Sequence, residues 1–182
     1  MHIDSKQSLQ IEAALEKVKS GGDFMLGYPV SQDFDYSLLN EFLKYPINNI
    51  GDPFESSTNK IQTHKMETQV VDFFAKMFRA NPEDYWGYVT NGGSESNLYG
   101  LYIARELYPS AMVYFSNSTH YSIKKNIRLL NIPSIVIRSL KNGEIDYEDL
   151  ENTLQYNRDK PAIILTNFGT TMKEAKAVSY TH

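Results

Sequence analysis

The sequence predicts an α/β protein built around a mainly parallel β-sheet. From about residue 85 onward, short apolar runs alternate with segments of helical periodicity, and the connections between them are short. Strands that alternate with helices in this way form crossover units, in which parallel strands are covered by helices on both faces. The 182-residue chain has 41% apolar and 22% charged residues, which is ordinary globular usage, so it can build a core.

The first fifty residues are predicted to be an arm. A polar helix is expected over Ser8–Lys19, because a glycine pair follows that segment and ends the helical period. We therefore expect residues 1–50 to form a helical arm, and residues 51–182 to belong to the α/β domain.

A second helix is predicted over Lys65–Arg79, and the Asn81-Pro82 pair ends it. Its apolar residues recur at helical spacing: Val70, Val71, Phe74, Met77 and Phe78. A continuous apolar stripe of this kind is expected to be buried.

The remaining elements follow in alternation. The predicted strands are residues 86–89, 111–115, 134–137 and 162–165. The predicted helices are residues 94–108, residues 119–130, and a helix that is capped by Asp146 and contains Leu150 and Leu154. A turn is expected at the Asn142-Gly143 pair.

Composition and charge argue against several classes of function. The net charge is -4 and there is no basic block, so nucleic acid is not an expected partner. The chain has no cysteine, and its four histidines lack the spacing of a zinc-binding helix, so no metal site is expected. No apolar run approaches the roughly 20 residues of a membrane helix, and the N-terminus is charged where a signal peptide would be apolar. We expect a soluble, cytoplasmic protein with no membrane partner.

The first candidate site loop is TNGGSESN, Thr90–Asn97, which follows a predicted strand and opens a predicted helix. Ligands of open α/β sheets collect at the carboxyl ends of the strands. The glycines permit close backbone approach, and the unpaired N–H groups and positive dipole end of a helix favour a phosphate. The alternative is a tight turn capped by Ser94. The loop lacks the glycine patterns of a P-loop or a dinucleotide fold, so nucleotide binding is not indicated.

Two further loops follow predicted strands. SNSTHYS, Ser116–Ser122, places His120 at the start of a helix, where its ring either stacks on a planar ligand or serves as a cap. TNFGTT, Thr166–Thr171, offers a flexible glycine and two threonine hydroxyls, although a merely hydrophilic loop is the alternative.

Taken together, these loops resemble the pyridoxal-phosphate-dependent group II amino-acid decarboxylases. Within that group the resemblance is closest to the histidine decarboxylases of Gram-negative bacteria, and it runs through most of the chain. It is carried by GYPVSQDFDYS at residues 27–37, INNIGDPFESS at 47–57 and WGYVTNGGSESN at 86–97. HYS at His120 and NGEIDYEDL at residues 142–150 extend it.

The resemblance implies a fold and a cofactor. The fold is the N-terminal part of the large domain of pyridoxal-phosphate-dependent transferases of fold type I, the aspartate-aminotransferase-like group, with an incomplete sheet. Residues 51–182 would be the N-terminal part of that cofactor-binding domain. The cofactor is pyridoxal 5′-phosphate, and the implied reaction is decarboxylation of L-histidine to histamine by a homodimer or homotetramer.

The resemblance also implies site residues. Gly92, Gly93 and Ser94 match the loop that holds the cofactor phosphate. His120 matches the histidine that stacks on the pyridine ring and lies beside the substrate. Thr170 falls in the GTT element that lines the cofactor.

A further segment, Asn49–His64, resembles the part of the family that helps form the substrate mouth, shared across a dimer interface. His64 itself is expected to be a packing or surface residue.

Two parts of the family's site do not occur in this sequence: the Asp of a D-x-A motif that holds the pyridine nitrogen, and the Schiff-base lysine of an HK dipeptide. None of the lysines present lies in that motif, among them Lys124, Lys125, Lys173 and Lys176. We therefore expect an incomplete piece of a histidine decarboxylase that is inactive alone. The alternatives are another group II decarboxylase, acting on an aromatic or small polar amino acid, and a short non-catalytic binding protein.

Overall fold

The computed structural model of the chain describes residues 4–26 and 35–177. The chain divides into two compact units, Met1–Trp86 and Gly87–His182. The predicted boundary after residue 50 stays a prediction. His2, His182 and most of the motif at residues 27–37 lie outside the described residues.

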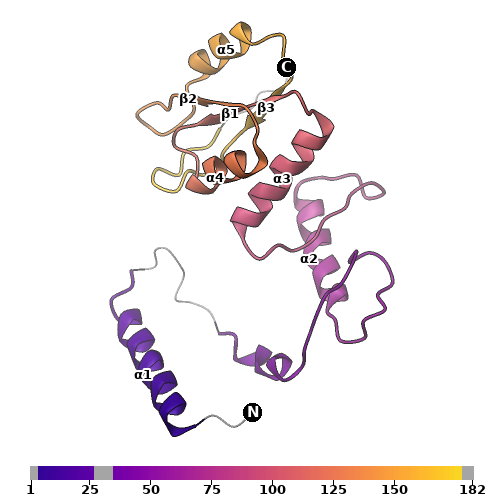
Figure 1. The fold of residues 1–182 in the computed structure, drawn as a ribbon, viewed down its shortest axis with the longest axis vertical. Coiled ribbons are helices and arrows are strands. Elements are labelled where there is room, and N and C mark those ends of the chain that lie inside the picture. The colour runs from indigo at the N-terminus through magenta and orange to yellow at the C-terminus, as the bar shows by residue number, and fades with distance from the viewer. Residues whose placement is uncertain (1–3, 27–34, 178–182) are drawn as a thin grey trace. The chain divides into compact units, whose positions relative to one another are not determined.

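The first unit consists of helices joined by irregular chain (Figure 1). Helix α1 spans Ser5–Gly22, the 3₁₀-helix η1 spans Ser37–Lys44, and helix α2 spans His64–Met77. The predicted helix over Ser8–Lys19 lies within α1, but α1 begins earlier, at Ser5, and includes the glycine pair that was expected to end it.

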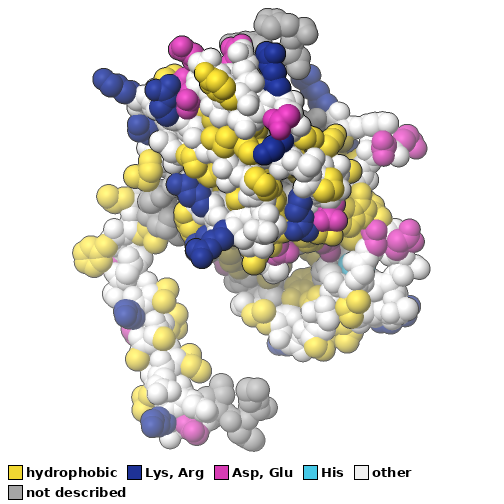
Figure 2. Space-filling view, turned by 45° about the horizontal axis from the view of Figure 1, so that its top comes forward, with side chains coloured by type: hydrophobic (Ala, Val, Ile, Leu, Met, Phe, Trp, Pro, Cys, Tyr) yellow, Lys and Arg dark blue, Asp and Glu magenta, His cyan; other side chains and the backbone are white. Residues whose placement is uncertain are grey.

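Helix α1 is started by local hydrogen bonds. Asp4 Oδ1 accepts from Gln7 N at 2.8 Å, and Gln7 Oε1 accepts from Asp4 N at 3.1 Å, which is a capping box. None of the helix residues is buried, and hydrophobic side chains lie along its exterior (Figure 2). The most exposed large ones are Leu9, Ile11, Leu15 and Val18.

The apolar stripe of α2 is exposed, so the prediction that it is buried is wrong. The helix itself is confirmed, but Val70 is 44%, Phe74 46% and Phe78 78% exposed. Phe74 contacts Phe73 and Phe78 of its own segment, with ring centroids 5.3 and 6.5 Å away. A helical stripe is buried only when another element covers it, and no element in the described part of this unit does so.

The second unit is the predicted α/β structure. Its elements are α3 Gly93–Leu107, β1 Met112–Ser116, α4 Tyr121–Leu130, β2 Ser134–Ile137, α5 Tyr147–Tyr156 and β3 Ala162–Leu165. The strands are parallel in the order β2-β1-β3, and Val113 of β1 lies beside Ser134 and Ile163. Helices α3 and α4 cover one face and α5 the other (Figure 1). The parallel sheet with helices on both faces is confirmed.

The predicted strand over residues 86–89 is wrong. These residues have no strand conformation in the structure, and the sheet consists of β1, β2 and β3. A strand exists only where its backbone pairs with a neighbouring strand, and this segment takes no part in the β2-β1-β3 ladder. Its apolar residues serve side-chain contacts instead: the Tyr88 and Tyr99 rings meet edge to face at 5.1 Å.

Two hydrophobic clusters hold the second unit together. Val113 and Phe115 of β1 point to the α3 and α4 face, whereas Tyr114 points to the α5 face, because successive side chains of a strand alternate. The first cluster is completed by Leu101, Ile123, Ile127 and Ile132. The second contains Ile137 and Ile145, with Leu150 and Leu154 packed against it. Helix α5 therefore packs against this cluster through Leu150 and Leu154, the two leucines named in the sequence prediction.

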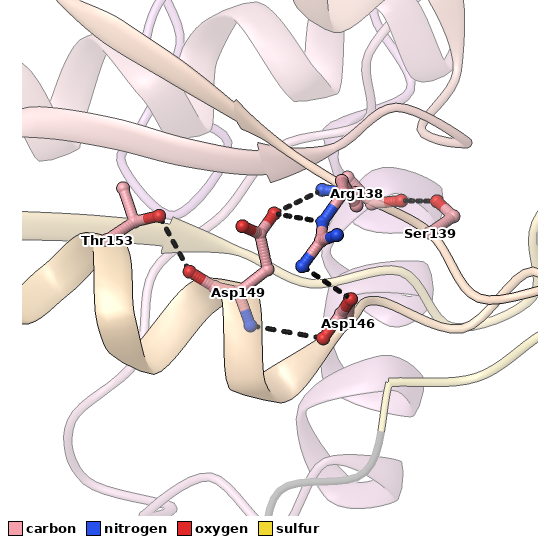
Figure 3. A network of polar contacts seen from close by, with 6 residues as sticks. Arg138, Ser139, Asp146, Asp149 and Thr153 are labelled. Carbon is pink, nitrogen blue, oxygen red and sulfur yellow. Dashed lines mark hydrogen bonds and ion pairs between the residues drawn. The ribbon is translucent and has the colours of Figure 1, made fainter.

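A polar network fixes the crossover from β2 to α5 (Figure 3). Asp149 Oδ2 accepts from Arg138 N at 2.8 Å and lies 3.4 Å from Arg138 Nε. Asp146 caps α5 as predicted, accepting from Asp149 N at 3.1 Å, and its other oxygen lies 3.3 Å from Arg138 Nη2. The intervening turn passes through Gly143 at φ +93°, a conformation that favours glycine, so the predicted turn is confirmed.

Candidate functional site

The loop that leads into α3 has the local structure expected of an anion site. Gly92 is the N-cap and Gly93 the first helical residue. The N–H groups of Gly93 and Ser94 therefore lie in the first turn, which has no intrahelical acceptor for them. The positive end of the helix dipole is in the same place. The first helical turn can thus offer two N–H donors to a phosphate.

There is room for a ligand at this turn. A Cβ atom added at Gly92 or Gly93 would meet nothing within 4 Å. Ser94 is exposed, so its hydroxyl is accessible as well. The glycines therefore leave the helix end open toward a bound group.

Glu95 forms hydrogen bonds with Asn91 across the Thr90–Asn97 loop. Its Oε2 accepts from Asn91 N at 2.9 Å and from Asn91 Nδ2 at 3.1 Å. These two bonds, the backbone bond first, lower the pKa of the Glu95 carboxyl below its usual range. Thr90 Oγ1 and Ser96 Oγ, 2.6 Å apart, add a second link across the loop.

His120 lies at the start of α4, after the end of β1. It is the N-cap residue, and its ring is exposed beside Tyr121, with ring centroids 4.3 Å apart. Its Nδ1 lies 2.8 Å from Ser122 Oγ and accepts from Ser122 N at 3.3 Å. His120 Nδ1 therefore serves as the helix cap, as in the capping alternative. The cap does not use the ring face or Nε2.

Two partly buried hydrogen bonds join the N-terminal halves of α3 and α4. Asn97 Nδ2 donates to Ser122 Oγ at 3.1 Å, and Asn126 Nδ2 donates to Ser94 O at 2.9 Å. Ser122 is 2% and Asn126 7% exposed. The structure thereby brings the predicted phosphate loop and the predicted stacking histidine together at one place.

Thr170 lies in a closed loop after β3. It is buried, its Oγ1 accepts from Ala175 N at 3.1 Å, and its N–H donates to Ala175 O at 3.0 Å. The Thr170 hydroxyl thus keeps its proton and one acceptor lone pair for a ligand. The preceding Asn167 donates from Nδ2 to Thr119 Oγ1 at 2.8 Å, which ties this loop to the His120 loop.

The Asn49–His64 segment belongs to the first unit. Asn49 Oδ1 accepts from Thr63 N at 2.8 Å, and Asn49 Nδ2 donates to Glu67 Oε2 at 2.8 Å, so this side chain fixes the segment on α2. His64 is buried, as its expected packing role requires, and neither ring nitrogen has a hydrogen-bond partner among the described residues.

Three residues of the site were not singled out from the sequence: Asn97, Ser122 and Asn126. Asn97 and Ser122 each lie within a motif, but nothing in either motif shows that they bond to each other. Asn126 lies at helical spacing from Ile123 and Ile127, on the buried face of α4. This spacing is the one signal in the sequence that points to Asn126.

Three lysines of the second unit have other contacts. Lys173 Nζ donates to Lys141 O at 2.7 Å, Lys125 Nζ lies 4.6 Å from the Tyr121 ring centroid, and Lys176 Nζ lies 5.2 Å from that of Phe168. Among the described residues, no group of three or more His, Asp or Glu side chains is placed to hold a metal ion.

Comparison with known proteins gives relatives over nearly the whole chain. A histidine decarboxylase of Mesorhizobium japonicum is 47% identical over 174 residues, which are 96% of this chain and 47% of that protein. A histidine decarboxylase of Vibrio anguillarum is 48% identical over 152 residues, 84% of this chain and 39% of that protein. The chain is a homologue of histidine decarboxylases. It spans less than half the length of these two relatives. No family model matches it.

A solved structure supports the fold of this histidine decarboxylase homologue. The L-methionine decarboxylase of Streptomyces sp. 590 superposes with a TM-score of 0.84 at 25% identity. The match covers 96% of this chain and 46% of that one. The chain therefore has part of the fold of an amino-acid decarboxylase, as an incomplete α/β sheet with flanking helices. No helix among the described residues is both long and apolar enough to cross a bilayer.

Proposed function

We propose that the chain supplies the phosphate-binding helix end and the stacking histidine of a pyridoxal-phosphate-dependent histidine decarboxylase, which converts L-histidine to histamine and carbon dioxide. The observation that carries this proposal is the pair of bonds Asn97–Ser122 and Asn126–Ser94, which hold the start of α3 against the start of α4. The relatives named histidine decarboxylase, at 47% and 48% identity, support the choice of substrate.

The first turn of α3 fits the phosphate of the cofactor. The N–H groups of Gly93 and Ser94 would bind its oxygens, and the Ser94 hydroxyl would add a third donor. The open space at Gly92 and Gly93 is what a closely approaching anion requires. When bound, pyridoxal phosphate supplies the electron sink for cleavage of a bond next to the substrate amino group.

His120 fits the other end of the site. Its ring is exposed, and its Nδ1 is held by Ser122, so the ring offers a fixed flat surface on which the pyridine ring would stack. A clamped plane is useful because the bond that breaks must stand perpendicular to it. Thr170 is the weakest fit, since its Oγ1 already accepts from Ala175 N.

The proposal includes an amino acid, L-histidine, as the small-molecule substrate, a homodimer or homotetramer, and a cytoplasmic location. A second candidate function is decarboxylation of another amino acid by the same machinery. The L-methionine decarboxylase of Streptomyces sp. 590, with its TM-score of 0.84, is the observation that favours it.

Titration of the purified chain with pyridoxal phosphate tests the cofactor site. Gly93→Val should weaken binding at least tenfold, because the new side chain enters the open space at the helix end, where an added Cβ meets no protein atom within 4 Å. Gly100→Val is the matched control: it adds the same side chain to the same helix, also with nothing within 4 Å, and should change affinity less than twofold. Equal effects of the two substitutions would contradict a phosphate site at Gly93.

Activity of the complete enzyme tests the reaction. His120→Ala should lower the rate of histamine formation strongly while part of the cofactor stays bound. Histidine, methionine and aromatic amino acids should be compared as substrates under the same conditions. A preference for methionine or an aromatic amino acid would favour the second candidate, and unchanged kinetics in His120→Ala would remove His120 from the site.

A further inference from the structure

We propose that Asn97 and Ser122 are positioning residues that hold His120 in the tautomer with its proton on Nε2. This inference deepens the proposed function and rests on it, because the tautomer matters to a ligand only if His120 faces one. The hydrogen-bond network itself is a property of the chain without a ligand.

The direction of the network follows from its first member. An amide nitrogen can only donate, so Asn97 Nδ2 donates to Ser122 Oγ, at 3.1 Å. The Ser122 hydroxyl then has one proton of its own to place. Its other close partner is His120 Nδ1, 2.8 Å away. The hydroxyl proton therefore points at Nδ1, and Nδ1 is an acceptor.

A second donor acts in the same direction. The backbone N–H of Ser122 also points at His120 Nδ1, at 3.3 Å, and a backbone N–H cannot reverse its role. A proton on Nδ1 would face both donors. In the neutral imidazole the proton must therefore be on Nε2.

The network is protected from water at its centre. Ser122 is 2% exposed, so no solvent molecule readily replaces either of its two side-chain bonds. His120 is exposed, and its Nε2 has no hydrogen-bond partner among the described residues. This hydrogen-bond network, the tautomer lock, leaves the Nε2–H of His120 free for an acceptor on a bound ligand.

Nitrogen NMR of the full chain, labelled on histidine imidazole nitrogens and free of ligand, tests the lock directly. The chain has only four histidines, and His120→Gln assigns the signal. At a pH where the ring is neutral, we expect Nδ1 of His120 to be the unprotonated nitrogen and Nε2 the protonated one. A rapidly averaged mixture of the two tautomers would overturn the proposal.

Asn97→Asp is the decisive variant. A carboxylate can only accept, so the Ser122 hydroxyl should turn to it, and Ser122 Oγ should become an acceptor for a proton on His120 Nδ1. We expect the preference for a proton on Nε2 to be lost and the two nitrogens to give averaged signals, because the Ser122 N–H still points at Nδ1. Asn126→Asp is the matched control, because it makes the same change in the same contact between helices but has no bond to Ser122. It should leave the His120 nitrogens unchanged.

Ser122→Ala gives a second measurement if Asn97→Asp does not fold. It removes the hydroxyl, and the His120 signals should shift toward the averaged values of a free imidazole. Unchanged signals in both Asn97→Asp and Ser122→Ala would overturn the lock.

The cofactor titration separates this inference from the proposed function. Cofactor binding that Gly93→Val weakens, with His120 nitrogens that do not respond to Asn97→Asp, would overturn the lock alone. Loss of the Nε2 preference in Asn97→Asp, with a complete enzyme that binds no pyridoxal phosphate, would confirm the network and overturn the proposed function.

Discussion

The two units of the chain differ in what stabilises their helices. In the first unit, α1 buries no residue and α2 buries only His64, so these helices rest on local hydrogen bonds such as the capping box of Asp4. In the second unit, α3 and α4 share a buried cluster with strand β1. An apolar stripe becomes part of a core only where a neighbouring element packs against it.

The largest expected effect compares a phenylalanine from each unit. Phe115 is 2% and Phe73 59% exposed. Phe115→Ala should lower the free energy of unfolding by about 3–5 kcal/mol, because it leaves a cavity in a packed cluster. Phe73→Ala should change it by less than about 0.5 kcal/mol. Urea denaturation followed by circular dichroism measures both, and similar losses in the two variants would remove the contrast.

The next effect concerns the crossover network of Figure 3. Asp149→Ala removes the acceptor for Arg138 N and leaves that N–H and the guanidinium less well paired. We expect a loss of about 1–3 kcal/mol in the free energy of unfolding of the second unit. Glu148→Ala removes a charge from the same helical turn without touching Arg138, so it should cost clearly less. Equal losses would mean that only the helix dipole is involved.

A substitution with the opposite effect on stability sharpens the comparison between the two units. His64 is buried with both ring nitrogens unpaired among the described residues. His64→Leu should raise the free energy of unfolding by about 1 kcal/mol, because it relieves the desolvation of a polar ring. His120→Leu, which removes a hydrogen-bonded cap, should lower it instead. A destabilised His64→Leu would show that the imidazole has a partner.

The smallest effect is a pH dependence at the start of α3. The bonds from Asn91 lower the pKa of Glu95 from its ordinary value of 4.5. The stabilisation is therefore complete above 4.5 and is lost as the pH falls through the lowered pKa. Unfolding measured across this range should show a small slope that disappears in Glu95→Gln. An unchanged slope in that variant would assign the slope to other carboxyls.

Strand prediction succeeded where the segment had a neighbour. Residues 134–137 and 162–165 agree with β2 and β3 at both ends, and residues 111–115 differ from β1 by one residue. Residues 86–89 carry a similar apolar run but form no strand. The sequence of a segment indicates its tendency to be extended. Strand pairing also requires a second segment, which can lie far away along the chain.

The candidate site also has parts that the sequence predicts and parts that it does not. The loops around Gly93 and His120 could be placed from the sequence, because glycine, serine and capping residues mark the start of a helix. The bonds from Asn97 to Ser122 and from Asn126 to Ser94 could not. Each bond depends on the packing of α3 against α4. This packing brings together residues that are 25 and 32 positions apart in the sequence.

The sequence by itself determined most of the alternation of helices and strands, the helix start at Asp146, and the position of the site loops. These features depend on hydrogen bonds and side-chain periods within a few residues. The tertiary structure decided which apolar stripes are buried, which extended run becomes a strand, and how His120 is held. These depend on contacts between distant segments, and such contacts form only when the chain packs.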